Sequence, residues 1–228
     1  EIIRNCRAIT HYRKERGMIV NILTGCLLGA AMKPLSDPLS RRLLTVRNKE
    51  YRETRKMYLL QLLISALLGG GIGYRFGFSL QSLFLILLLF VGNVISFTDI
   101  QCRIIPNDMI ITIFGIKLVF GILALMKVGN LPKWNPLLSL AGFAVLAAIF
   151  FLPVIFGKKI GFGDIKLAMA MGFAAELMPG LYAICLMGGL VILYGFLQRE
   201  VPFVGFLKMN FPMGPFLCTA LIVALLIP

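Results

Sequence analysis

The sequence predicts an all-α fold, a polytopic membrane helical bundle of about eight transmembrane helices, and three observations favour it. The chain is 59% hydrophobic, 14% charged and has a mean hydropathy of +0.90, whereas soluble domains are about 45 to 50% apolar and about 25% charged. Its apolar residues fall in stretches near the length that crosses a bilayer. Its charged residues gather at the ends of those stretches.

A bilayer core about 30 Å thick requires about 20 apolar residues in a helix. Five stretches are clear candidates, at 57–74, 80–97, 109–126, 137–156 and 180–197. Three are shorter, at 18–32, 165–178 and 212–228. The glycine-rich stretch "LLGGGIGY" at 67–74 predicts a close approach between two helices, because small residues let backbones pack in lipid.

Two parts of the chain are expected. Residues 1–56 comprise a basic N-terminal arm, the first apolar span and a short basic loop at 33–56, and residues 57–228 form the main membrane domain. No removable signal peptide is expected, because the first apolar stretch is followed by a basic loop and further spans.

The formal net charge of +13 raises the question of a nucleic-acid partner. No stretch interleaves basic residues with exposed aromatic ones, so we expect no nucleic acid and instead anionic membrane lipids. The five cysteines are scattered singly without a Cys-x-x-Cys pattern, which predicts neither a zinc ribbon nor a disulfide framework. No metal is therefore expected.

Topology follows from the Lys and Arg residues, which are in excess in cytoplasmic loops. The loop 33–56 and the connections on its side carry most of them, and the opposite side receives Arg75, Lys127 and Lys133. This predicts a multi-pass protein of the cytoplasmic (inner) membrane with loop 33–56 inside. The arm 1–17 is also basic although it falls outside, so either the first stretch does not span or the arm lies along the membrane surface.

Carboxylates at membrane depth are costly and each calls for an explanation. Asp99, Asp108 and Asp164 adjoin the cytoplasmic ends of their spans, whereas Glu176 lies at the far end of its own span and is expected to share no site with them. In "IIPND", Asn107 or Asp108 is expected to cap the next helix.

Asp99 and Asp164 each have a structural and a functional interpretation. The structural interpretation of Asp99 is an exposed acid at a helix end that pairs with Arg103. An acid at a helix C-terminus is unfavourable with respect to the helix dipole, so local stability does not explain its position. Asp164 can be the N-cap of "IKLAMAMGF", but Gly161 and Gly163 are more than a cap needs and suit a close backbone approach.

Taken together, Asp99 and Asp164 suit general acid–base chemistry. Two carboxylates that share one proton leave one as general base for water and the other as general acid for the leaving nitrogen. The single histidine, His11, lies in the basic arm, so neither a Ser-His-Asp triad nor a His-Glu-x-x-His zinc site can be assembled.

Two motifs in this order resemble the type IV prepilin peptidase family: "FTDIQCRIIPN" at 97–107 and "GFGDIKLAMAMG" at 161–172. Members of the family carry an Asp before an "rriIPN"-like stretch and then a Gly-x-Gly-Asp-Ile/Val-Lys motif. The stretch "FPMGPFL" at 211–217 also resembles their last span. The resemblance covers about residues 57–228, which it identifies as a peptidase membrane domain.

The resemblance implies that Asp99 and Asp164 are the catalytic pair of an aspartyl endopeptidase, with Gly161, Gly163 and Lys166 as a supporting motif. Such an enzyme removes the short basic leader of prepilins or pseudopilins at the cytoplasmic face without a cofactor. Lys166 either anchors its helix or lowers the pKa of a nearby carboxylate.

Many bacterial members also methylate the new N-terminus with S-adenosylmethionine, and these usually carry Cys-x-x-Cys pairs in their first cytoplasmic region. Loop 33–56 is short and cysteine-free here, so S-adenosylmethionine is expected only if that activity is retained.

Two other functions stay open. Presenilin and signal peptide peptidase share Gly-x-Gly-Asp, but they pair it with Tyr-Asp and Pro-Ala-Leu, whereas Thr98 precedes Asp99 here and Pro-Ala-Leu is absent. A small proton-coupled transporter also uses membrane acids.

Overall fold

A computed structural model describes residues 2–49, 53–129, 131–157, 161–197 and 212–227, and within these ranges it contains helices and no strand. The described helices are α1 (Ile2–Val46), α2 (Arg55–Phe76), α3 (Leu80–Cys102), α4 (Asn107–Leu125), α5 (Pro136–Ile155), α6 (Phe162–Ala175), α7 (Leu177–Leu197) and α9 (Gly214–Leu226). The predicted all-α fold is confirmed.

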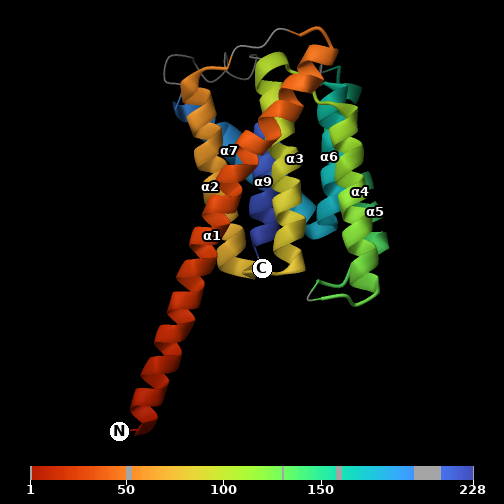
Figure 1. The fold of residues 1–228 in the computed structure, drawn as a ribbon. Coiled ribbons are helices and arrows are strands. Elements are labelled where there is room, and N and C mark those ends of the chain that lie inside the picture. The colour runs from red at the N-terminus through yellow and green to blue at the C-terminus, as the bar shows by residue number, and fades with distance from the viewer. Residues whose placement is uncertain (1, 50–52, 130, 158–160, 198–211, 228) are drawn as a thin grey trace.

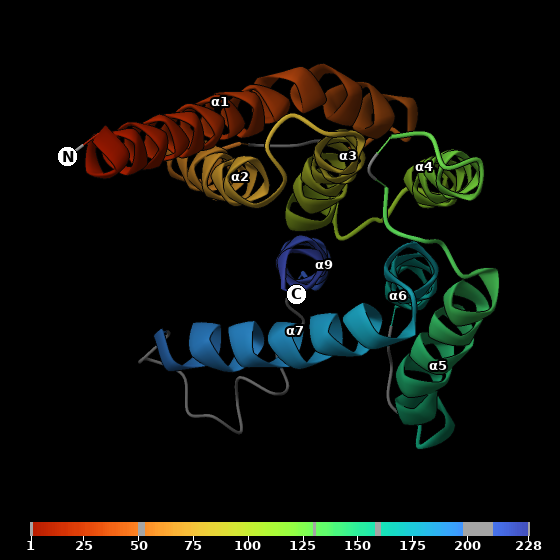
Figure 2. The same cartoon turned by 90° about the horizontal axis from the view of Figure 1, so that it is seen from below.

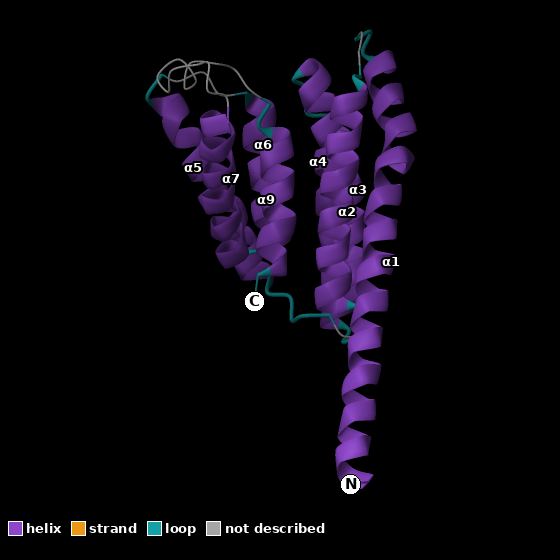
Figure 3. Cartoon of the chain, turned by 90° about the vertical axis from the view of Figure 1, so that its left-hand side faces the viewer, coloured by secondary structure: helices purple, strands orange, loops and turns teal. Residues whose placement is uncertain are grey.

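Helix α9 occupies the middle of the bundle (Figure 2), where it packs on α2, α3, α6 and α7. Helices α4 and α5 pack on α6 at one side, and α1 packs on α2 and α3 at the other. The amino-terminal part of α1 extends beyond the other helices (Figures 1 and 3). The core is formed mainly by α3 and α6, with further residues from α4 and α9.

Among the described residues, six helices are long and apolar enough to cross a membrane, as expected for a multi-pass membrane protein. They are Gly17–Val46, Arg55–Phe76, Leu80–Cys102, Asn107–Leu125, Pro136–Ile155 and Leu177–Phe196. Helices α6 and α9 have 14 and 13 residues and are shorter than the roughly 17 needed to span. Most of their residues are buried among the other helices. The apolar stretches predicted at 165–178 and 212–228 therefore correspond to short core helices.

The prediction of a loop at 33–56 is wrong for its first part, because α1 continues to Val46. The sequence suggests an end at Met32 because a lysine follows it, but the Lys33 side chain is fully buried. Its ammonium pairs with Asp37 at 2.5 Å and with Glu53 at 3.1 Å. The basic arm and the first apolar stretch belong to one continuous helix, α1.

Glycines bring α1 and α2 together, as the stretch at 67–74 predicts. A Cβ atom added at Gly69 would meet the carbonyl oxygen of Gly25, and one added at Gly29 would meet the carbonyl oxygen of Ser65. The backbones of the two helices are therefore in direct contact, which only glycine allows at these positions.

We expect Gly69→Ala to destabilise the protein by about 1 to 3 kcal/mol, because the new methyl group must push two backbones apart. Gly115→Ala in α4 is the matched control, since nothing lies within 4 Å of a Cβ at that position. Thermal unfolding of both variants in the same detergent measures the difference. Equal stability of the two variants would contradict the close packing of α1 on α2.

Candidate active site

Asp99 lies in the last turn of α3, which extends to Cys102 and is longer than the predicted span 80–97. Only 4% of the residue is exposed. The helix ends at Arg103, whose backbone adopts a left-handed conformation and donates its N–H to the Asp99 carbonyl at 2.9 Å. The carboxylate therefore faces the interior although Asp99 is at a helix end.

The start of α9 provides the hydrogen-bond partner of this carboxylate. The Gly214 N–H donates to Asp99 Oδ2 at 2.7 Å, and the contact is buried. The positive end of the α9 dipole faces the acid and offsets its unfavourable place at the C-terminus of α3. Sequence reasoning missed this role of Gly214, because no local signal links residues 115 positions apart.

Asp164 lies in the first turn of α6 and is partly buried. The N-cap of this helix is Gly161, so the interpretation of Asp164 as the N-cap is wrong. Both glycines have close neighbours, but these are side chains and not the second backbone that the sequence predicts. A Cβ at Gly161 would lie 2.9 Å from Asp164 Oδ2, and a Cβ at Gly163 would lie 3.2 Å from Cβ of Ile105.

The two sequence motifs form one site. Ile105 of the first motif packs on Gly163 of the second, and Lys166 Nζ lies 3.4 Å from Asn107 Oδ1. The Asp99 carboxylate is near enough to act electrostatically on Asp164. Lys166 is otherwise exposed. The bundle thus places both acids at the end where α3 finishes and α6 begins.

Asp108 and Glu176 lie outside this site. Asp108 is in the first turn of α4, whose N-cap is Pro106, so neither it nor Asn107 is the predicted cap. Its side chain is 65% exposed and lies 3.8 Å from Arg47. Glu176 ends α6, roughly 18 Å along the helix from Asp164 at 1.5 Å per residue. The predicted separation of Glu176 from the other acids is therefore confirmed.

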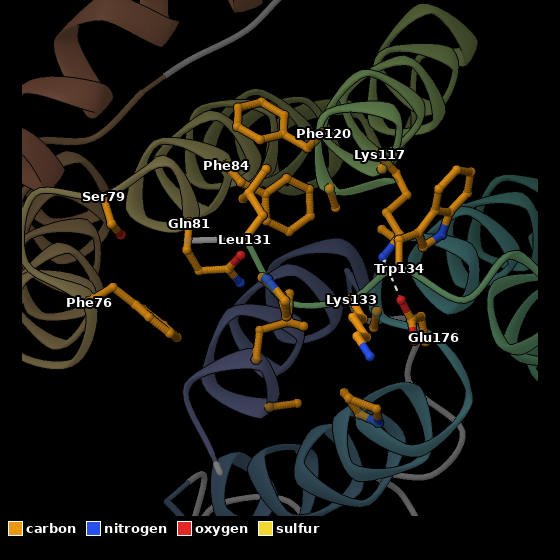
Figure 4. A pocket seen from close by; sticks show the side chains of 18 of the residues that line it. Phe76, Ser79, Gln81, Phe84, Lys117, Phe120, Leu131, Lys133, Trp134 and Glu176 are labelled. Carbon is orange, nitrogen blue, oxygen red and sulfur yellow. Dashed lines mark hydrogen bonds and ion pairs between the residues drawn. The ribbon is translucent and has the colours of Figure 1, made fainter. Parts of the chain in front are cut away.

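Glu176 belongs to a different cavity of about 710 Å³ at the opposite end of α6 (Figure 4). Its carboxylate pairs there with Lys117 Nζ at 3.0 Å, beside Trp134 and Lys133. In the described residues, no group of three or more His, Cys, Asp or Glu side chains could hold a metal ion.

A buried cation supports α3 near Asp99. The ammonium of Lys33 lies 4.7 Å from the ring centre of Phe97 and 5.2 Å from that of Tyr58, in addition to its two carboxylate partners. Lys33, the first residue of the predicted basic loop, is therefore not accessible to lipid headgroups. It joins α1, α2 and α3 beside the site.

Fold and site together define a multi-pass helical membrane protein with two neighbouring carboxyl groups at one end of its bundle. The model of the type IV leader peptidase family matches residues 82–196, half of the chain. The chain belongs to the type IV leader peptidase family. The matched region contains both Asp99 and Asp164.

One curated relative is a prepilin leader peptidase/N-methyltransferase from Stutzerimonas stutzeri, which is 26% identical over 119 residues. The alignment covers 51% of this chain and 40% of that protein, so the chain matches less than half of the relative's length. No solved structure matches the chain significantly.

Proposed function

We propose that this protein is a membrane-embedded aspartyl endopeptidase that removes the short basic leader of type IV prepilins or pseudopilins. The observation that carries the proposal is the juxtaposition of Asp99 and Asp164 at one end of the bundle, in a chain that belongs to a leader peptidase family. Family membership favours this function over the presenilin-like protease and the transporter. The position of both acids at one end, and not at mid-depth, is also poorly suited to a proton relay across the membrane.

The chemistry follows from two carboxyl groups that share one proton. The Gly214 N–H bond stabilises negative charge on Asp99, so we assign Asp99 as the general base that takes a proton from the attacking water. Asp164 is then the acid that polarises the scissile carbonyl and passes a proton to the leaving nitrogen. The water oxygen forms the new bond to the carbonyl carbon as the C–N bond breaks.

We propose that the site faces the cytoplasm at the inner membrane. The end of the bundle that holds the two acids also holds the end of α1 and the start of α2 (Figure 1). This stretch of the chain carries exposed basic residues, namely Arg42, Lys49, Arg55 and Lys56. Positive residues of this kind are typical of cytoplasmic faces and bind anionic lipid headgroups.

We propose that leader cleavage needs no cofactor. Transfer of a methyl group from S-adenosylmethionine is a separate reaction, and residues 33–56 lack the cysteine pairs found in methylating members. Incubation with a prepilin and S-adenosylmethionine should therefore yield a mature chain without an added methyl group.

The proposal is tested by incubating the detergent-solubilised protein with a purified prepilin. Mass spectrometry should show two fragments whose masses add up to the substrate plus one water, with the cut between the leader and the apolar segment. An intact prepilin after prolonged incubation, with a known leader peptidase cleaving it in parallel, would overturn the proposal.

A further prediction concerns the bond between α9 and Asp99. A Cβ at Gly214 would lie 2.9 Å from Asp99 Oδ2 and 3.1 Å from its Cβ. Gly214→Ala should therefore displace the carboxylate and lower kcat/KM about tenfold to hundredfold, because small misplacements of reacting groups are costly. Gly189→Ala in α7, where nothing lies within 4 Å, is the control and should keep wild-type activity. Equal activity of the two variants would show that the bond plays no part in catalysis.

A further inference from the structure

A groove of about 450 Å³ runs along the part of α3 that leads to Asp99. Residues of α3 and α9 form its floor, and α2 and α7 form its walls. Among the described residues α2 and α7 do not contact each other, and they lie on opposite sides of α9 (Figure 2). The lining is mostly apolar and includes Leu60 and Ile64 from α2 and Leu190 from α7.

The groove ends close to Asp99 in the sequence of α3, although Asp99 itself is not part of its lining. Along α3 it extends from Leu89 to Ile100, about 16 Å at 1.5 Å per residue. Ser96 and Ile100, which flank Asp99 in sequence, belong to its lining. An apolar segment that lies in the groove therefore has one end near the turn of α3 that carries Asp99.

Two buried polar atoms in the lining have no partner among the described residues, namely Asn93 Nδ2 and Gln61 Oε1. Asn93 is only 7% exposed, and its Oδ1 accepts a hydrogen bond from Ser65 Oγ at 2.7 Å. Unsatisfied polar atoms are costly at membrane depth, where no water replaces the missing partner. The groove thus offers one hydrogen-bond donor and one acceptor to a ligand.

We propose that this groove binds the apolar segment of the substrate polypeptide that follows the scissile bond; this inference rests on the proposed function. Asn93 Nδ2 and Gln61 Oε1 pair there with a carbonyl and an N–H of the substrate backbone. The first N–H groups of a helix lack partners within the helix and match the acceptor Gln61 Oε1. The carbonyl for Asn93 Nδ2 would come from the non-helical residues between the scissile bond and that helix. A lipid acyl chain fills an apolar groove equally well but offers neither group.

The test places a photo-reactive residue at Leu60 or Leu190, on the two walls, and irradiates the full-length protein with a prepilin labelled in its apolar segment. The control is Ile111 in α4, which is 67% exposed against 59% for Leu60 and lies a similar distance from the start of its helix. We expect substrate crosslinks at both wall positions, several times stronger than at Ile111.

A second arm measures cleavage by Asn93→Leu. Loss of one hydrogen bond to bound substrate should raise KM about threefold to tenfold with little change in kcat. Ser139→Ala, a buried polar residue at the other end of the bundle, is the control and should leave KM unchanged.

The outcomes separate the groove from the proposed function. Cleavage by the wild-type protein with substrate crosslinks no stronger than at Ile111, or with crosslinks to lipid alone, would overturn the groove and leave the peptidase intact. Failure of the wild-type protein to cleave would overturn both.

Discussion

Asp164→Asn and Asp99→Asn are each expected to lower kcat/KM for prepilin cleavage by about 10² to 10⁴, the range typical of a lost general acid or base. Asparagine keeps the size and shape of each side chain but can neither take the proton from water nor give one to the leaving amine. The measurement is the initial rate of leader release by each purified variant at low substrate concentration.

Asp108→Asn is the matched control for these variants, because Asp108 lies at the start of a helix of the same bundle but is exposed and paired only loosely with Arg47. It should keep wild-type activity. The folded state of each variant is checked by its unfolding temperature. An Asp99→Asn or Asp164→Asn protein as active as Asp108→Asn would return that aspartate to a structural role.

Lys33→Met is expected to cost about 3 to 5 kcal/mol of stability, because it leaves the buried Asp37 carboxylate without its Lys33 partner and takes from Glu53 one of its two cations, the other being Arg41 at 3.4 Å. Methionine replaces much of the apolar stem, so the effect isolates the loss of charge. Thermal or denaturant unfolding in detergent measures it. Loss of activity is expected to follow, since Lys33 also packs on Phe97, two residues before Asp99.

Lys166→Met is the control for Lys33, because Lys166 is exposed and its hydrogen bond to Asn107, at 3.4 Å, is long. Its stability should stay within about 0.5 kcal/mol of wild type. Similar stabilities of the Lys33→Met and Lys166→Met proteins would mean that the buried ion pairs contribute nothing to the fold.

Local patterns in the sequence predict much of this protein. Long apolar stretches identify the membrane helices, and the glycines at 67–74 predict the contact of α2 with α1. The motifs around Asp99 and Asp164 identify the candidate site. Each motif places its aspartate at the end of an apolar run, next to the residues that surround it in the sequence.

Contacts between distant residues are what the sequence does not predict. The hydropathy pattern predicts that the first span stops before Lys33, because a lysine is polar. The pattern cannot show that Asp37 and Glu53 pair with the buried Lys33 ammonium. The Gly214 bond to Asp99 joins α9 to α3 through a backbone N–H, which carries no side-chain signal. The N-caps of α4 and α6 are Pro106 and Gly161, whereas the sequence predicts polar residues nearby. Backbone geometry decides these caps, and a side-chain pattern does not show it.

The most direct test of the central claim, that two carboxylates act as one catalytic unit, is the single-turnover cleavage rate of the Asp99→Asn, Asp164→Asn double variant. If the pair works on one proton, removal of either member disables both, and the double variant should cleave about as slowly as each single variant. Losses that multiply in the double variant would contradict this account, because they would mean that the two aspartates contribute independently.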